Sequence, residues 1–93
     1  MDRNYPDYWA DKGTTLGVLG RYEEAIECYN KFIGLGPNYD DAYMSMFHLY
    51  AGIMSDKLGK HKNAIGYYKR ALYLDSDVID KANLDSTIKI NLN

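Results

Sequence analysis

One segment of this chain occurs twice, and this repetition restricts the possible folds more than any other feature of the sequence. The segment from Gly20 to Ile33 reads GRYEEAIECYNKFI, and a similar segment from Gly59 to Leu72 reads GKHKNAIGYYKRAL, an offset of 39 positions. A period of roughly 20 to 50 residues is typical of supersecondary units that cannot bury their apolar faces alone and therefore stack on one another. The sequence thus predicts a single domain, residues 1–93, built from two similar modules.

Apolar periodicity and turn residues divide each module into two helices. In the first copy the spacing i, i+3, i+4, i+7 of an amphipathic helix selects Ala25, Ile26, Tyr29, Phe32 and Ile33. In the second copy it selects Ala64, Ile65, Tyr68, Ala71 and Leu72 as the inner face. A glycine begins each repeated segment, at a place where a left-handed residue commonly ends the preceding helix. Helices are expected at residues 6–19, 22–35, 41–58, 61–74 and 77–90. Such short connections make antiparallel helical hairpins, so we predict an all-α fold with five helices.

Two glycines, Gly13 and Gly17, lie four residues apart inside the first expected helix. Each weakens a helix by about 1 kcal/mol relative to Ala. We expect a neighbouring helix to approach closely there, because a missing Cβ allows two backbones to come near each other.

Residues of both copies match the motif of a known family. In the first copy they are Trp9, Lys12, Gly13, Leu16, Gly20, Tyr22, Ala25, Tyr29, Phe32 and Pro37. In the second copy they are His48, Ala51, Gly52, Ser55, Gly59, His61, Ala64, Tyr68, Ala71 and Ser76. Together they resemble the tetratricopeptide repeat (TPR), a helix–turn–helix unit of about 34 residues. The resemblance implies a right-handed α–α superhelix of two TPR-like hairpins, with repeat 1 at residues 6–39, repeat 2 at 40–76 and a C-terminal capping helix at 77–90.

The second copy departs from the usual spacing of this family. A step of about 34 residues from Trp9 reaches Tyr43, whereas equivalent residues from Gly52 onward lie 39 apart. We interpret the difference as a five-residue insertion in the first helix of repeat 2. Five residues lengthen a helix by about 7.5 Å and turn its face by roughly 140°. We therefore expect a protruding first turn, or a π-bulge between Met46 and Tyr50.

Composition and charge argue against several classes of function. The net charge is −2, the pI is near 5.5, and no block of Lys or Arg occurs, so neither nucleic acid nor an anionic membrane is an expected partner. No apolar run approaches the roughly 18 residues that a membrane-spanning helix needs. The polar start at residues 1–4 does not have the form of a signal peptide. Cys28 is the single cysteine and forms no intramolecular disulfide. We expect a cytoplasmic protein.

No group of residues has the pattern of a catalytic, cofactor or metal site. His48 and His61 are expected on different helices, and Cys28 lies elsewhere, so no pair has the spacing of metal ligands. Both histidines stand where the repeat usually has an aromatic ring, and we interpret them as packing residues. The chain shows no nucleophile beside a base and no Gly-rich phosphate loop. We expect neither enzyme activity nor a cofactor.

The resemblance to TPR proteins implies that the concave surface, formed by the first helix of each repeat, holds a peptide or partner segment. The residues expected to face this groove are Asp7, Asp11, Thr14, Met44, Ser45, His48, Asp80, Asn83 and Thr87. Family members that grip a C-terminal carboxylate place Lys and Asn four residues apart on the first helix, where this chain has Ala10 and Thr14. Such a clamp is not expected. Asp7 and Asp11 would suit a basic or polar segment, unless these residues form only a solvated face.

The last expected helix carries a second apolar stripe at i, i+4 and i+8, formed by Leu84, Ile88 and Leu92. A terminal helix of a repeat array should be polar on its outer side. Either the chain is a fragment of a longer array, whose next helix covers the stripe, or two copies bury it together. A structural homodimer through this stripe is therefore the alternative to a non-catalytic interaction module or scaffold. The residues identify no particular partner.

Overall fold

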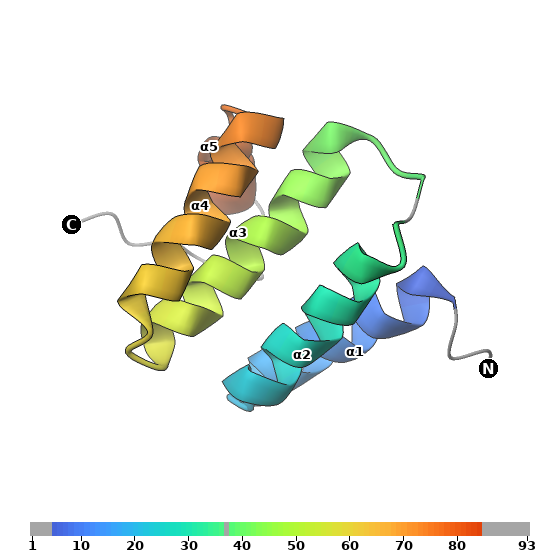
Figure 1. Ribbon diagram of the computed structural model, residues 1–93, viewed down its shortest axis with the longest axis vertical. Helices are drawn as coiled ribbons and strands as arrows, with labels where there is room; N and C mark the ends of the chain where they lie inside the picture. Colours follow the sequence, from blue (N-terminus) through green and yellow to red (C-terminus); the bar gives the residue numbers. More distant parts are fainter. Residues whose placement is uncertain (1–4, 37, 85–93) are drawn as a thin grey trace.

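The computed structural model describes residues 5–36 and 38–84, except for the side chains of residues 83 and 84. Its helices are α1 (Pro6–Val18), α2 (Tyr22–Gly34), α3 (Asp41–Lys57), α4 (His61–Leu74) and α5 (Val78–Leu84), as Figure 1 shows. These residues contain no strand, so the prediction of an all-α fold with five helices is confirmed. The first four helices begin at the predicted residues and end within one residue of the predicted ends. Residues 85–90, which complete the predicted last helix, lie outside the described residues.

The same turn structure joins the two helices of each hairpin. Gly20 and Gly59 have φ values of 80° and 79°, in the left-handed region that favours glycine. The amide of Arg21 donates to the carbonyl of Leu16 at 2.9 Å, and that of Lys60 donates to the carbonyl of Ser55 at 2.8 Å. These bonds satisfy carbonyl groups that the end of a helix would otherwise leave unpaired.

Glycine also allows the two helices of each hairpin to pack closely. A Cβ atom at Gly13 would lie 2.8 Å from the ring of Tyr29, and one at Gly52 would lie 2.6 Å from the ring of Tyr68. Gly52 and Tyr68 occupy the same places in the second repeat as Gly13 and Tyr29 in the first, so the hairpins share this contact. A Cβ atom at Gly17 would overlap the terminal methyl group of Met54 in α3. The expected close approach of a neighbouring backbone is confirmed at Gly13, where the carbonyl oxygen of Ala25 lies 3.2 Å from the Cβ position. At Gly17, by contrast, the nearest atoms belong to the side chain of Met54.

Helix α3 forms the centre of the molecule. It packs against α2, α4 and α5, and its seven consecutive residues 49–55 are all buried. This segment is buried on every side and needs no single apolar stripe, whereas residues 41–48 before it include exposed and half-buried positions.

The extra residues lengthen α3 without distorting it. The helix has 17 residues, against 13 in α1, and it is a regular α-helix throughout. The predicted π-bulge is therefore wrong. Aromatic packing covers the added first turn, because the ring of Tyr43 lies 6.4 Å from that of Phe32 and 5.1 Å from that of Phe47, between centroids.

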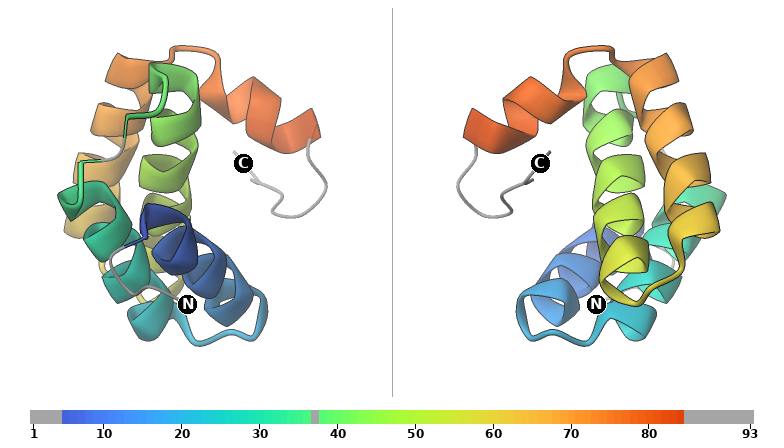
Figure 2. Two further views of the ribbon diagram at one scale, coloured as in Figure 1. Left: turned by 90° about the vertical axis from the view of Figure 1, so that its right-hand side faces the viewer. Right: turned by 90° about the vertical axis from the view of Figure 1, so that its left-hand side faces the viewer.

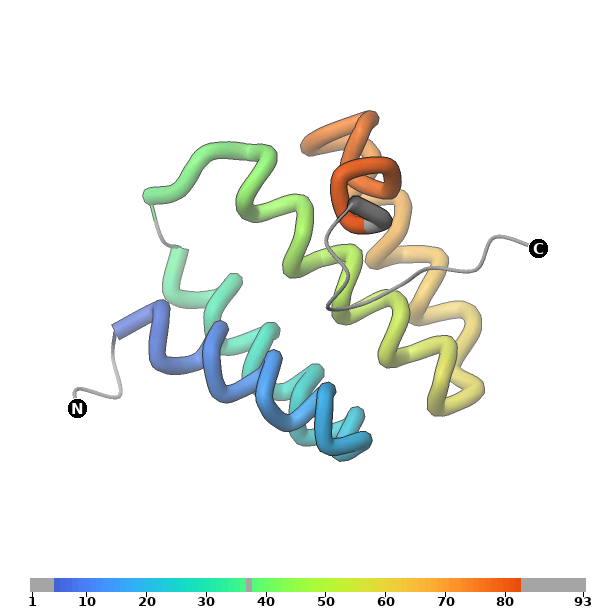
Figure 3. Tube along the Cα trace, turned by 180° about the vertical axis from the view of Figure 1, so that it is seen from behind, coloured from blue at the N-terminus to red at the C-terminus, as the bar shows by residue number. Residues whose placement is uncertain are grey.

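The helices form two layers, which Figures 1 and 3 view from opposite sides. Helices α2 and α4 lie nearer the viewer in Figure 1, and α1 and α5 lie nearer the viewer in Figure 3. Figure 2 shows α1 and α5 on the same side of α3. The described part of α5 packs mainly against α3, with Val78 and Ala82 buried. The face formed by α1, α3 and α5 is thus the one on which the sequence places a groove.

Candidate partner-binding surface

Two carboxylates and two tyrosines meet where the first turns of α1 and α3 approach each other. The hydroxyl of Tyr39, in the loop before α3, donates a hydrogen bond to the Asp7 carboxylate in α1. The ring of Tyr43 packs on that of Tyr39, with 4.8 Å between the centroids. Asp11 lies one helical turn after Asp7 and is exposed. We call these four residues the Tyr–carboxylate cluster.

Both phenols of the cluster lie beside carboxylates, and this position affects their pKa values. The hydrogen bond to Asp7 raises the pKa of Tyr39 to about 12. Burial raises the pKa of Tyr43, and the charges of Asp7 and Asp11 raise it further. Neither carboxylate forms an ion pair with a described residue. The cluster therefore presents negative charge beside two rings that remain about two-fifths exposed.

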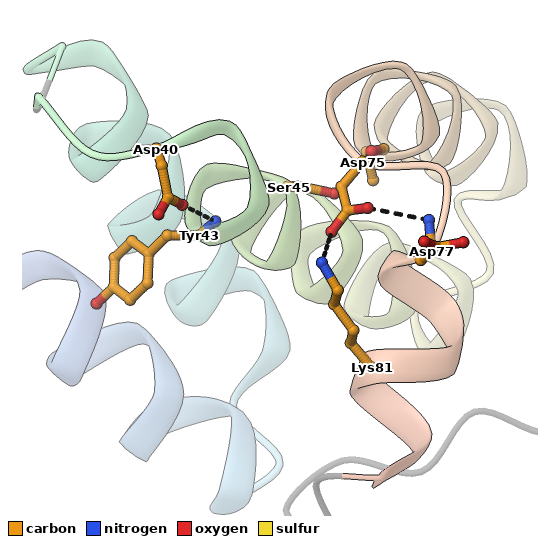
Figure 4. A network of polar contacts seen from close by, with 7 residues as sticks. Asp40, Tyr43, Ser45, Asp75, Asp77 and Lys81 are labelled. Carbon is orange, nitrogen blue, oxygen red and sulfur yellow. Dashed lines mark hydrogen bonds and ion pairs between the residues drawn. The ribbon is translucent and has the colours of Figure 1, made fainter.

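A second group of polar residues ties α5 to Asp75, the residue that follows α4, as Figure 4 shows. The carboxylate of Asp75 accepts hydrogen bonds from the amide of Asp77 at 3.0 Å and from Lys81 Nζ at 2.6 Å. The bond to Asp75 raises the pKa of Lys81, and Asp40, which caps α3, contributes to the shift. Asp80, the residue before Lys81, is exposed.

Ser45 does not belong to the predicted groove. Its side chain is fully buried, and its hydroxyl donates to the carbonyl oxygen of Ala71 in α4 at 2.6 Å. The insertion rotates this part of α3, so that the serine points between α3 and α4 rather than to the surface. The prediction that Ser45 contacts a partner is wrong.

Three other predicted groove residues are half-buried. Thr14 is engaged within the first hairpin, since its hydroxyl bonds the carbonyl of Ala10 at 3.1 Å and the Tyr29 hydroxyl at 3.0 Å. Met44 packs against the core. Burial lowers the pKa of His48, and the charge of Arg70 lowers it further. Their contact with a partner stays a prediction, as does that of Asp7, Asp11 and Asp80.

The second histidine of the motif has a different environment. His61 is exposed at the start of α4, and its Nδ1 lies 2.9 Å from Asp56 Oδ1. The interpretation of His61 as a packing residue is therefore wrong, because the side chain makes a surface contact at the hairpin turn.

The remaining predicted residues are not covered by the structure. The side chains of Asn83 and Leu84, and residues Thr87, Ile88 and Leu92, lie outside the described residues. The self-association stripe therefore stays a prediction.

Sequence reasoning missed Tyr39 and Tyr43 as surface residues of this face. The available signal was the composition, since ten of the 93 residues are tyrosine. Tyrosine suits half-buried positions where the ring packs and the hydroxyl meets a polar group. The partner of Tyr39, far earlier in the chain, could be identified only from the fold.

The first hairpin also has an open recess of about 470 Å³ between α1 and α2. Its lining residues are Trp9, Lys12, Leu16, Arg21, Glu24, Glu27, Cys28 and Lys31. The thiol is buried, and burial raises its pKa, so it is a poor nucleophile near neutral pH. In the part of the chain that the structure describes, no three potential ligands converge on a metal site, and no helix is long and apolar enough to cross a membrane.

Comparisons with known proteins agree with this architecture. The family model of the tetratricopeptide repeat matches residues 6–39 and 51–78. The uncharacterized protein MJ0572 of Methanocaldococcus jannaschii is 30% identical over 83 residues, which cover 87% of this chain and 91% of that protein. No solved structure gives a significant match.

Proposed function

Because this chain belongs to the tetratricopeptide-repeat family, whose members generally mediate protein–protein interaction, we propose that its α1/α3/α5 face binds a basic segment of a partner protein. The chain acts in this proposal as a non-catalytic interaction module. The single observation that supports the basic character of the partner is the Tyr–carboxylate cluster.

The cluster has the two features that recognise a Lys or Arg side chain. The exposed parts of the Tyr39 and Tyr43 rings can contact a cation, a contact worth about 0.5–1 kcal/mol at exposed sites. Asp7 and Asp11 provide acceptors beside these rings and have no ion pair with any described cation. Asp80, on α5, is an exposed carboxylate that would add to the negative charge. Complementary charge of this kind directs encounter and orientation more than it adds affinity.

The proposal is tested by the anisotropy of labelled peptides that contain Lys or Arg at varied positions, with neutral and acidic peptides in parallel. Basic peptides should bind, and binding should weaken as salt is raised, because screening acts strongly on exposed charges. The Asp7→Asn and Asp11→Asn substitutions should each weaken binding.

Glu27→Gln is the matched control, since Glu27 is an exposed carboxylate in the recess between α1 and α2. If Glu27→Gln weakened binding as much as Asp11→Asn, the effect would reflect net charge rather than the cluster. Equal binding of acidic peptides would also contradict the proposal.

A further inference from the structure

The outer side of α4 carries a stripe of residues whose counterparts in α2 lie beside the second hairpin. The stripe consists of Lys62, Ile65, Lys69 and Leu72, at i, i+3, i+7 and i+10, and we call it the α4 seam. The equivalent residues of the first repeat are Glu23, Ile26, Asn30 and Ile33, and we call these the α2 seam.

The two seams differ in exposure. Ile26 and Ile33 are half-buried and pack against the core. Ile65 and Leu72 are 52% and 42% exposed, although periodicity predicts them on the inner face of α4. Helix α5 does not cover them, since its described part packs mainly against α3. The α4 seam is therefore an apolar surface of the kind that, one repeat earlier, receives another hairpin.

Two polar contacts join the α2 seam to the second hairpin. Lys60 Nζ lies 3.0 Å from Glu23 Oε1, and the Tyr67 hydroxyl donates to Asn30 Oδ1 at 2.9 Å. The second hairpin thus supplies two donors, Lys60 just before α4 and Tyr67 within it, and the α2 seam supplies two acceptors on either side of Ile26.

The α4 seam reverses this arrangement. Lys62 and Lys69 replace the two acceptors, and α4 contains no Asp or Glu at all. A helix that covers Ile65 and Leu72 in the same manner must therefore bring acceptors where the second hairpin brings donors. We propose that the α4 seam binds an amphipathic helix of a partner protein that carries acidic residues, about seven apart, beside its apolar stripe. This surface lies on a different helix from the Tyr–carboxylate cluster and selects the opposite charge.

A second copy of this chain, stacked on the α4 seam in the same way, does not bring acceptors to Lys62 and Lys69. If its first hairpin stacked on the α4 seam as the second hairpin stacks on α2, Arg21 and Cys28 would occupy the places of Lys60 and Tyr67. Arg21 would then face Lys62, and juxtaposed like charges oppose association. The charge pattern favours a different protein as the occupant.

The test uses two labelled synthetic helical peptides of equal length that share an i, i+3, i+7, i+10 leucine stripe. They differ only at the flanking positions, seven residues apart, which carry Glu in one peptide and Lys in the other. The Glu peptide should bind the intact chain at least about tenfold more tightly than the Lys peptide. Lys69→Glu leaves one Lys and one Glu on the seam, so it should abolish this preference, and Leu72→Ser should weaken binding of the Glu peptide.

Arg70→Glu is the matched control, because it makes the same change of charge at the next residue, which is exposed but lies off the seam. It should leave the preference for the Glu peptide intact, as should Asp7→Asn in the other proposed surface. Equal binding of both peptides, or an equal effect of Arg70→Glu, would overturn the proposal. A dimer seen by analytical ultracentrifugation and lost in Leu72→Ser would overturn it as well, since a second copy would then occupy the seam.

Discussion

Two glycines on neighbouring helices should respond to the same substitution in opposite directions. At Gly52 in α3 a Cβ atom would lie 2.6 Å from the Tyr68 ring and 3.2 Å from Tyr67 Cβ. At Gly66 in α4 it would have no neighbour within 4 Å. Gly52→Ala and Gly66→Ala therefore gain the same helix propensity, while only the first introduces a steric clash.

The magnitudes follow from these contacts. Replacing Gly by Ala inside a helix contributes about 1 kcal/mol of stability. Overpacking costs about 1–3 kcal/mol. The Tyr68 ring cannot move away freely, because its hydroxyl donates to Asp56 Oδ2 at 2.7 Å, a bond worth about 1 kcal/mol. We expect Gly66→Ala to stabilise the chain by about 1 kcal/mol. In Gly52→Ala the steric cost and the loss of the Tyr68 bond, less the same gain in propensity, should destabilise it by about 1–3 kcal/mol.

Thermal unfolding followed by circular dichroism measures both changes. For a domain of this size about 1 kcal/mol shifts Tm by roughly 4–8 °C. Tm should rise by about that amount in Gly66→Ala and fall by at least as much in Gly52→Ala. An unchanged or higher Tm in Gly52→Ala would refute the close packing of α3 on α4.

Three further predictions concern single side chains. Burial and Arg70 lower the pKa of His48 below its usual 6.5, so the unfolded chain binds the proton more readily than the folded chain. Stability should therefore fall as pH drops below about 6.5. In urea titrations His48→Gln should remove this loss of stability between about pH 5 and 6.5. Asp40 accepts from the amide of Tyr43 at 2.8 Å, so Asp40→Ala should cost about 1 kcal/mol of unfolding free energy, and no change would contradict its role as a cap. Cys28 is 5% exposed, and burial raises the pKa of its thiol. A thiol reagent should therefore label Cys28 slowly in buffer and rapidly in denaturant. Equal labelling rates would contradict its burial.

Features set by adjacent residues could be predicted from the sequence, and features set by distant ones could not. The left-handed glycines that follow α1 and α3, Gly20 and Gly59, follow from local backbone preference, and both are at the predicted residues. The burial of Ser45 depends on how the insertion rotates α3 against α4, which periodicity does not report. Periodicity also predicts the apolar positions Ile65 and Leu72 without indicating what covers them, and in the described structure they are exposed.

The burial of residues 49–55 of α3 has a consequence for how the molecule unfolds. Helix α3 packs against α2, α4 and α5, so loss of the first hairpin or of α4 would bring part of this segment into water. The two repeats should therefore melt in one cooperative transition despite their modular sequence. Hydrogen exchange should be slowest in the middle of α3, and a fragment of the first hairpin alone should not hold a fixed structure.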